Sequence, residues 1–421
     1  MKSSFLFLLS VTALNLCVSA HTPINEPLLV KPGIWRGVFT TATAEIPFNF
    51  EIKGTDQSRL ILTLLNAGRR DDFTVERKGQ DSLLVPMNTF DAALLIKVQA
   101  GGLLRGVYQN KVPGNKSKPI AFAAEYGKSY RFAQPATKLE SMTNLSGKWL
   151  IKIQGKETVP DKVALFTQKG NALSGVIMQV TGDSGDLEGN VEGSNFQLSS
   201  FIGSSPKLYK GSIQPDGTIA GIWSVSISGD TVRYTGSKRE DAALPDAYKL
   251  TYLKPGYEKL DFTFPGLDGR PVSLHDEQFK GKVVVIDIMG SWCPNCMDET
   301  QFLAPWYKAN KARGVEIAGV AFEYKDSLAY AQYTLHKLKA KYDIQYPLLF
   351  GGYADKQVVA NKFPALNAFL AFPTTILIDK QGRVREIYTG FSGKATGKYY
   401  DEFVAGFNKL IDILVAEPAA P

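Results

Sequence analysis

Two cysteines separated by two residues constrain this chain more than any other feature, because they follow an apolar run and precede a helical pattern. They are Cys293 and Cys296, with Pro294 and Asn295 between them and Trp292 before them. A disulfide across so few residues closes a tiny loop, and such a closure stabilises a fold very little. The pair therefore indicates thiol chemistry at a strand-to-helix turn rather than a structural crosslink.

The third cysteine, Cys17, lies in an N-terminal stretch that is typical of an export signal. Lys2 supplies a positive charge, an apolar segment spans 5–18, and small residues follow it. We predict a cleaved signal peptide at 1–20, an exported protein of the periplasm or cell envelope, and no transmembrane span in the remaining chain. A lipid anchor on Cys17 is the weaker alternative, because Leu16 before it is bulky for that processing.

The composition limits the architecture and the partners. The 421 residues exceed one ordinary domain, and 44% apolar with 21% charged residues is typical of a globular chain. Lysines and acids are interspersed, the formal net charge is +7, and the sequence has no basic stripe with interleaved aromatic residues. Two or three domains are therefore expected, and nucleic-acid binding is not.

The part of the chain after the signal has the pattern of an all-β protein. Short alternating runs are broken by Gly, Asn and Asp, which predicts sandwiches or barrels. We expect a first β-rich module at 21–140, a second at 141–240 and a linker at 241–254. A Gly/Trp element opens each module, with Trp35 and Trp149 as expected core residues, and it marks either a duplication or a chance recurrence.

The last part, 255–417, alternates strands with helices. Apolar runs and helical periodicity predict strands at 260–264, 272–274, 282–289, 315–323, 346–350, 374–378 and 384–389 and helices at 294–313, 326–342, 355–363 and 397–415. This order predicts an α/β domain with a mixed central sheet and helices on both faces. The whole chain is then multidomain, with all-β modules followed by an α/β domain.

Several motifs in this last part resemble the thioredoxin superfamily. Trp292 to Glu299 follows a buried strand, Phe372 to Thr375 precedes a later strand, and Tyr388 to Gly393 ends another. Together they resemble exported thiol-disulfide oxidoreductases of the TlpA/ResA kind over about 255–416. The resemblance implies a thioredoxin-like fold with a redox-active disulfide between the two motif cysteines. It does not extend to the N-terminal half.

The two cysteines have different expected roles because of their positions. Cys293 lies where unpaired N–H groups and the helix dipole stabilise a thiolate, and Pro294 suits the first helical position, which needs no N–H donor. This thiolate would attack a substrate disulfide and form a mixed disulfide. Cys296, one turn further and more buried, would then attack Cys293 and release the reduced substrate.

Two acids near the cysteines are candidates for moving the proton of Cys296. Asp287 ends an otherwise apolar strand, and Glu299 follows Cys296 by one helical turn. The resemblance implies an acid at both positions. A carboxyl in an apolar setting has a raised pKa and exchanges protons near neutral pH. The alternatives are a strand-end acid in solvent and an exposed first-turn acid, and the sequence does not assign the role to one of them.

Three further residues are expected to contact the substrate. The resemblance implies that Pro373 is cis and that the backbone of Phe372 before it pairs with the substrate chain. Trp292 would shield the disulfide and offer an apolar contact. The alternative for Pro373 is a trans proline that opens a strand.

The leading function is reduction of protein disulfides, and three other functions compete with it. A thiol peroxidase wants a Thr and a Pro where this chain has Gly290 and Ile286. A disulfide-forming oxidase differs from a reductase only in potential, which the motif does not fix. A non-enzymatic adaptor would use the β-rich modules for binding.

Cofactors and partners follow from the same reasoning. A zinc site needs about four ligands, and beyond His21 only His275 and His336 are available, so neither a metal nor another cofactor is expected. The expected partners are proteins with disulfides and, from the resemblance, a membrane thiol carrier that donates electrons. Roles in redox homeostasis and antioxidant activity would follow.

Overall fold

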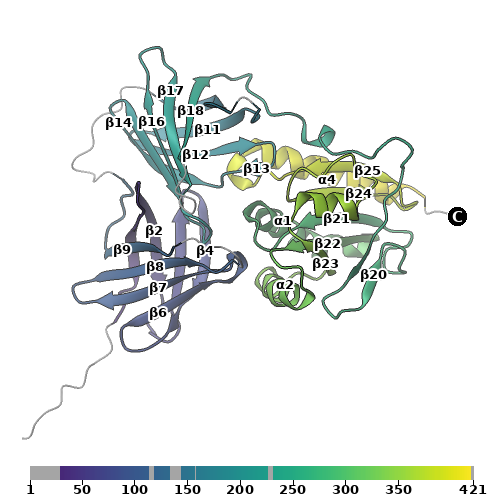
Figure 1. Ribbon diagram of the computed structural model, residues 1–421, viewed down its shortest axis with the longest axis horizontal. Coiled ribbons are helices and arrows are strands. Elements are labelled where there is room, and N and C mark those ends of the chain that lie inside the picture. Colours follow the sequence, from purple (N-terminus) through teal and green to yellow (C-terminus); the bar gives the residue numbers. More distant parts are fainter. Residues whose placement is uncertain (1–28, 113–117, 133–143, 157, 226–230, 419–421) are drawn as a thin grey trace, which may run out of the picture.

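The computed structural model describes most of the chain (Figure 1). The described residues are 29–112, 118–132, 144–156, 158–225 and 231–418. The signal peptide predicted at 1–20, Cys17 and the predicted boundary between the β-rich modules at 140 lie outside these ranges. Figure 1 shows two β-sheets from the first half of the chain beside a C-terminal α/β domain.

The first β-sheet is antiparallel and has nine strands among the described residues. They are β1 (Gly33–Thr40), β2 (Glu45–Lys53), β3 (Ile61–Asn66), β4 (Arg69–Thr74), β5 (Glu76–Arg77), β6 (Ser82–Met87), β7 (Ala92–Gln99), β8 (Leu103–Asn110) and β9 (Ile120–Tyr126), with the 3-10 turn η1 (Asn88–Phe90) between β6 and β7. Buried residues alternate with less buried ones along β6, as expected for a sheet with one face on a core. Phenylalanines such as Phe39 and Phe48, with ring centroids 4.4 Å apart, fill that core.

The second β-sheet is also antiparallel, again with nine strands in the described part. They are β10 (Gly147–Ile153), β11 (Lys162–Lys169), β12 (Ala172–Gln179), β13 (Gly182–Asp183), β14 (Leu187–Glu192), β15 (Asn195–Ser200), β16 (Lys207–Ile213), β17 (Ile219–Val225) and β18 (Thr231–Lys238). Strand β11 pairs with both β10 and β12, so the sheet closes on itself. The short β13 forms an antiparallel hairpin with the end of β12, on the side that faces the C-terminal domain.

The two Gly/Trp elements have the same local geometry. Trp35 and Trp149 are each 1% exposed, which confirms them as core residues. Each indole Nε1 donates to the backbone carbonyl four residues earlier, at 3.1 Å for Trp35 and 2.8 Å for Trp149. Gly33 and Gly147, two residues before them, have φ angles of 124° and 119°, which favour glycine. In both sheets the first strand pairs with the second and the last strand, so duplication is favoured over chance.

The C-terminal domain begins with a small hairpin and then builds a five-stranded sheet from the described residues. Its elements are β19 (Thr263–Pro265), β20 (Pro271–Ser273), β21 (Val283–Met289), α1 (Pro294–Asn310), η4 (Lys311–Arg313), β22 (Val315–Glu323), α2 (Leu328–Tyr342), β23 (Leu348–Tyr353), α3 (Lys356–Lys362), β24 (Thr374–Ile378), β25 (Val384–Thr389), η5 (Lys394–Thr396) and α4 (Lys398–Ala416). The sheet order is β23-β22-β21-β24-β25. Strands β21, β22 and β23 are parallel, whereas β24 and β25 are antiparallel to their neighbours.

Small differences from the predicted bounds have local causes. Helix α2 begins at Leu328 because the Ser327 side chain accepts from the Tyr330 N–H and caps it. Strand β23 begins after Pro347, two residues later than predicted. Helix α1 continues past Gln301 with Pro305 inside it.

The segment predicted as a linker, 241–254, packs against the C-terminal domain. It contains η3 (Ala247–Lys249), and Leu253 forms an isolated bridge with Leu366. The hydroxyls of Thr251 and Thr389 bond at 2.8 Å in a buried position. Within the described residues, no helix has the length and the apolar content needed to span a membrane.

Candidate redox site

The turn between β21 and α1 holds both cysteines. All seven residues of β21 are buried, and the chain then turns at Gly290, whose carbonyl accepts from the Cys293 N–H at 3.1 Å. Cys293 is the N-cap of α1, and its Sγ accepts from the Cys296 N–H at 3.4 Å. Pro294 occupies the first turn, where its missing N–H costs nothing. The Cys296 N–H and the N-terminal end of the α1 dipole are therefore both next to the Cys293 sulfur.

The two thiols are free, and Cys296 is the more buried of them. Cys293 is 6% exposed, whereas Cys296 is fully buried. Burial raises the pKa of the Cys296 thiol well above its usual value, and the neighbouring Cys293 sulfur and the Asp287 carboxyl raise it further. Cys296 therefore holds its proton when reduced and needs a base to become a nucleophile.

Three aromatic rings pack together next to Cys293. The ring centroid of Trp292 lies 4.8 Å from that of Tyr324 and 5.4 Å from that of Phe372. The indole Nε1 of Trp292 donates to the Phe322 carbonyl at 3.0 Å, which fixes the ring in place. The peptide bond between Phe372 and Pro373 is cis, as the sequence predicts, and the Phe372 carbonyl lies 3.6 Å from the Cys293 Sγ. The loop before β24 thus faces the thiol directly.

The two predicted acids form a buried pair behind the cysteines. Asp287 on β21 and Glu299 on α1 are both fully buried, so neither is the solvent-exposed acid of the alternative interpretation. The Thr375 hydroxyl donates to Glu299, whereas no N–H or O–H group of the described residues donates to Asp287. The remaining hydrogen-bonding neighbour of Asp287 is Glu299 itself, and two carboxyls bond when one of them carries a proton.

Burial sets the proton affinity of this pair. It raises the pKa of Asp287 to about 7, and it raises the pKa of Glu299 well above its usual value, with the Asp287 charge adding to the effect. The two groups titrate as a unit because each changes the charge that the other faces. Such a pair holds one proton near neutral pH and can accept a second from Cys296.

A third buried acid, Glu323, was not found from the sequence. It ends β22, is fully buried, and accepts from the Ser291 N–H at 3.0 Å and from the Ser291 hydroxyl at 2.7 Å. Burial raises its pKa to about 7. Ser291 lies two residues before Cys293, so Glu323 holds the turn that carries the motif. An acid at the end of an apolar strand, as at Asp287, was the available signal.

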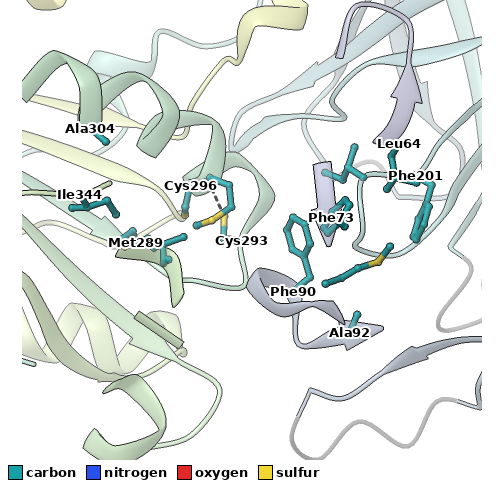
Figure 2. Close-up of a cluster of buried hydrophobic side chains, with 14 of the residues drawn as sticks. Leu64, Phe73, Phe90, Ala92, Phe201, Met289, Cys293, Cys296, Ala304 and Ile344 are labelled. Carbon is teal, nitrogen blue, oxygen red and sulfur yellow. Dashed lines mark hydrogen bonds between the residues drawn. The ribbon is translucent and has the colours of Figure 1, made fainter. Parts of the chain in front are cut away.

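The seven predicted site residues therefore come from β21, the turn after it, α1 and the loop before β24, and they meet at one place. They are Cys293, Cys296, Asp287, Glu299, Trp292, Phe372 and Pro373. Figure 2 shows the two cysteines beside Met289, with Phe73 and Phe90 of the first β-sheet region on the opposite side. These phenylalanines and the cysteines belong to one buried apolar cluster.

The two histidines that the sequence offered as metal ligands lie apart from this site. His275 pairs with Asp261 at 3.2 Å, and His336 bonds to the Gln332 carbonyl on the exposed side of α2. Among the described residues, no three His, Cys, Asp or Glu side chains gather as ligands for a metal ion.

Comparison with known proteins places similarity in the C-terminal domain. Residues 255–387 match the family model described as the AhpC/TSA family. The chain is 29% identical over 140 residues to the thiol-disulfide oxidoreductase ResA of Bacillus subtilis (strain 168), covering 33% of this chain and 69% of that protein. It is 30% identical over 142 residues to the ResA of Geobacillus kaustophilus (strain HTA426), covering 33% and 72%.

A solved structure is also similar. It is a thiol:disulfide interchange protein of the thioredoxin family from Chlorobium tepidum TLS, with 20% identity and a TM-score of 0.29, covering 38% of this chain and 96% of that one.

Proposed function

Because this chain belongs to the family of ResA-like thiol-disulfide oxidoreductases and is an oxidoreductase with a thioredoxin-like C-terminal domain, we propose that it reduces disulfides in exported proteins through Cys293 and Cys296. The observation that carries this proposal is the buried Asp287 carboxyl, which pairs with Glu299 and lies beside a buried thiol that holds its proton. A thiol that serves only structure has no use for a buried acid pair, which is costly to maintain.

The reaction proceeds in two exchanges. The Cys293 thiolate attacks one sulfur of the client disulfide, forms a mixed disulfide and displaces the other client sulfur, which takes up a proton. Cys296 then gives its proton to the pair formed by Asp287 and Glu299 and attacks the Cys293 sulfur. The second client sulfur leaves as a thiolate and takes up the proton that the acid pair releases. The client has then gained two electrons and two protons, and the enzyme holds the Cys293–Cys296 disulfide.

Two features of the site support the order of these attacks. Cys293 is the cysteine with measurable exposure and with a backbone N–H donor to its sulfur, which suits the first nucleophile. Cys296 is fully buried next to Asp287, which suits the second. The rings of Trp292 and Phe372, which pack against each other, would give the client chain an apolar contact beside the first sulfur.

The oxidised enzyme must be reduced again before it acts on another client. We propose that a membrane thiol carrier supplies the electrons on the exported side, where the predicted signal peptide at 1–20 would deliver the protein. Both the client protein and the thiol carrier then react with the enzyme by thiol–disulfide exchange, and we propose no cofactor for this exchange.

The reduction potential separates a reductase from a disulfide-forming oxidase. We expect equilibration with glutathione to give a value near the about −270 mV of thioredoxin rather than the about −120 mV of a strong oxidase. The measurement counts alkylated thiols on Cys293 and Cys296 across a series of glutathione ratios. A value near the oxidase limit would reverse the proposed direction, and consumption of hydrogen peroxide faster than of protein disulfides would favour the thiol peroxidase instead.

A further inference from the structure

The path by which a client reaches Cys293 is bordered by two loops of the C-terminal domain. One is the cis loop at Phe372 and Pro373, beside the thiol. The other follows β25, and its Gly390 N–H donates to the Pro373 carbonyl at 2.9 Å. These two loops, 372–373 and 390–393, lie side by side, and we call them the strip. This inference rests on the proposed function, because it concerns which clients can lie along that strip.

The second β-sheet covers the far end of this strip. A Cβ atom at Gly390 would lie 2.8 Å from the carbonyl carbon of Thr181, so backbone packs directly on backbone there. The Asp183 carboxyl accepts from the Gly393 N–H at 2.7 Å and from the Gly185 N–H at 2.6 Å. Asp183 is buried in this contact, which removes the last part of the strip from solvent.

The hairpin of β12 and β13 also binds Asn295, the second of the two residues between the cysteines. With its nitrogen toward the Asp183 carbonyl, the Asn295 carboxamide donates at 3.2 Å and accepts from the Asp183 N–H at 3.1 Å. A Cβ atom at Gly182 would lie 1.6 Å from a terminal atom of the Asn295 carboxamide, so only glycine allows this approach. Two peptide-like bonds therefore connect the redox motif to the second β-sheet.

The first β-sheet region borders the motif from the other side. Arg69 at the start of β4 pairs with Asp298 on α1 at 2.7 Å, and both side chains are mostly buried. Next to η1, Asp91 accepts from the Tyr330 hydroxyl on α2, and Asn88 accepts from Lys337 at 3.4 Å. Phe90 lies between Asn88 and Asp91 in the chain. Figure 2 shows it on the side of η1 that faces the cysteines.

We infer that these contacts select the clients of the enzyme by shape. The cover, defined as Thr181–Asp183 together with Asn88–Asp91, contacts Asn295 of the motif on one side and helix α2 on the other, and Cys293 is 6% exposed. On this inference, an extended chain segment or a small disulfide passes between the two parts of the cover, whereas a folded protein with a surface disulfide meets the cover before its sulfur meets the thiol. The enzyme therefore acts on disulfides in unfolded chains and excludes those of folded proteins.

The test compares two glycine variants of the full chain. Gly182→Ala places a methyl group where the Asn295 amide lies and should lift the hairpin. Gly185→Ala is the matched control, because Gly185 also has a positive φ, of 72°, but nothing lies within 4 Å of its Cβ position. The probes are N-ethylmaleimide and a maleimide carried on a small folded protein without cysteine. Peptide mapping identifies the alkylated residue as Cys293.

We expect Gly182→Ala to raise the ratio of the folded-carrier rate to the N-ethylmaleimide rate at least about tenfold, because local opening now exposes the thiol. Gly185→Ala should leave that ratio at the wild-type value. Equal ratios in wild type and Gly182→Ala, or an equal rise in both variants, would overturn the inference. If Gly182→Ala does not fold, Asp183→Ala, which removes the bond to Gly393, replaces it with the same expected rise.

Reduction of oxidised glutathione separates this inference from the proposed function. All variants and the wild type should reduce this small disulfide at similar rates, since it passes the cover. If none of them reduces it, the proposed function fails. If they do and the alkylation ratios do not differ, the shape selection alone is wrong.

Discussion

Replacing Cys293 with serine is expected to lower the rate of protein-disulfide reduction by at least about 10³-fold, because a hydroxyl at this position cannot form the mixed disulfide. The sulfur is the atom that attacks the client, and no other described thiol is exposed enough to take its place. The measurement is the initial rate at which the disulfides of an unfolded protein are reduced with dithiothreitol as the electron source, corrected for the reductant alone.

The same variant decides between an enzyme and a binding adaptor. Far-UV circular dichroism and thermal unfolding should match the wild type, because Cys293 is the N-cap of α1 and serine can take over that role. If Cys293→Ser kept both its fold and its role in the cell, the adaptor interpretation would replace the reductase.

Neutralising the buried acid pair should have the second-largest effect. In Asp287→Asn with Glu299→Gln, Cys296 loses its proton acceptor, and we expect resolution of the mixed disulfide to slow by about 10²-fold at pH 7. Rapid mixing of the reduced enzyme with a disulfide peptide separates this second exchange from the first. The first exchange should change little, because the pair lies beside Cys296 and not at the accessible sulfur.

The acid pair should also change how stability depends on pH. Burial raises the pKa of Asp287 from 3.8 to about 7 in the folded protein. The stability that the protonated Asp287 carboxyl contributes to the folded protein is therefore fully present below the pKa of this group in the unfolded chain. That contribution is lost as the pH rises through about 7. Each pKa unit corresponds to about 1.4 kcal/mol, so the double variant should have a higher free energy of unfolding than the wild type at pH 8.

An exposed acid serves as the control for both measurements. Asp401 lies in the first turn of α4 and is solvent-exposed, so Asp401→Asn should leave both the exchange rate and the pH dependence unchanged. Urea unfolding from pH 4 to pH 8 gives the stability profiles. If the double variant had the wild-type profile and rate, Asp287 and Glu299 would be structural residues only.

The sequence was most informative where local patterns decide the structure. The buried strand at 315–323 and the strand at 374–378 have the predicted bounds, because continuous apolar runs next to turn residues admit little else. The burial of Asp287 and Glu299 was one of two interpretations that the residues left open, and the resemblance to the thioredoxin superfamily favoured it.

The contacts between distant segments could not be predicted in this way. Glu323 and Ser291 are 32 residues apart, and Gly182 contacts Asn295 across two domains. Neither pair has a spacing that a helix or strand period would expose. The closure of the second β-sheet through β11 and β12 likewise depends on how a whole sheet curves, which no single segment encodes.

The central claim is that Cys293 attacks a client and Cys296 releases it, and capture of the covalent intermediate tests this most directly. Cys296→Ser, mixed with an unfolded disulfide-containing protein and digested without reductant, should yield a client peptide joined to the Cys293 peptide in the mass spectrum. Dithiothreitol should release it, and Cys293→Ser should yield none. The account would be contradicted if no such adduct formed, or if Cys293→Ser accumulated an adduct on Cys296 as readily.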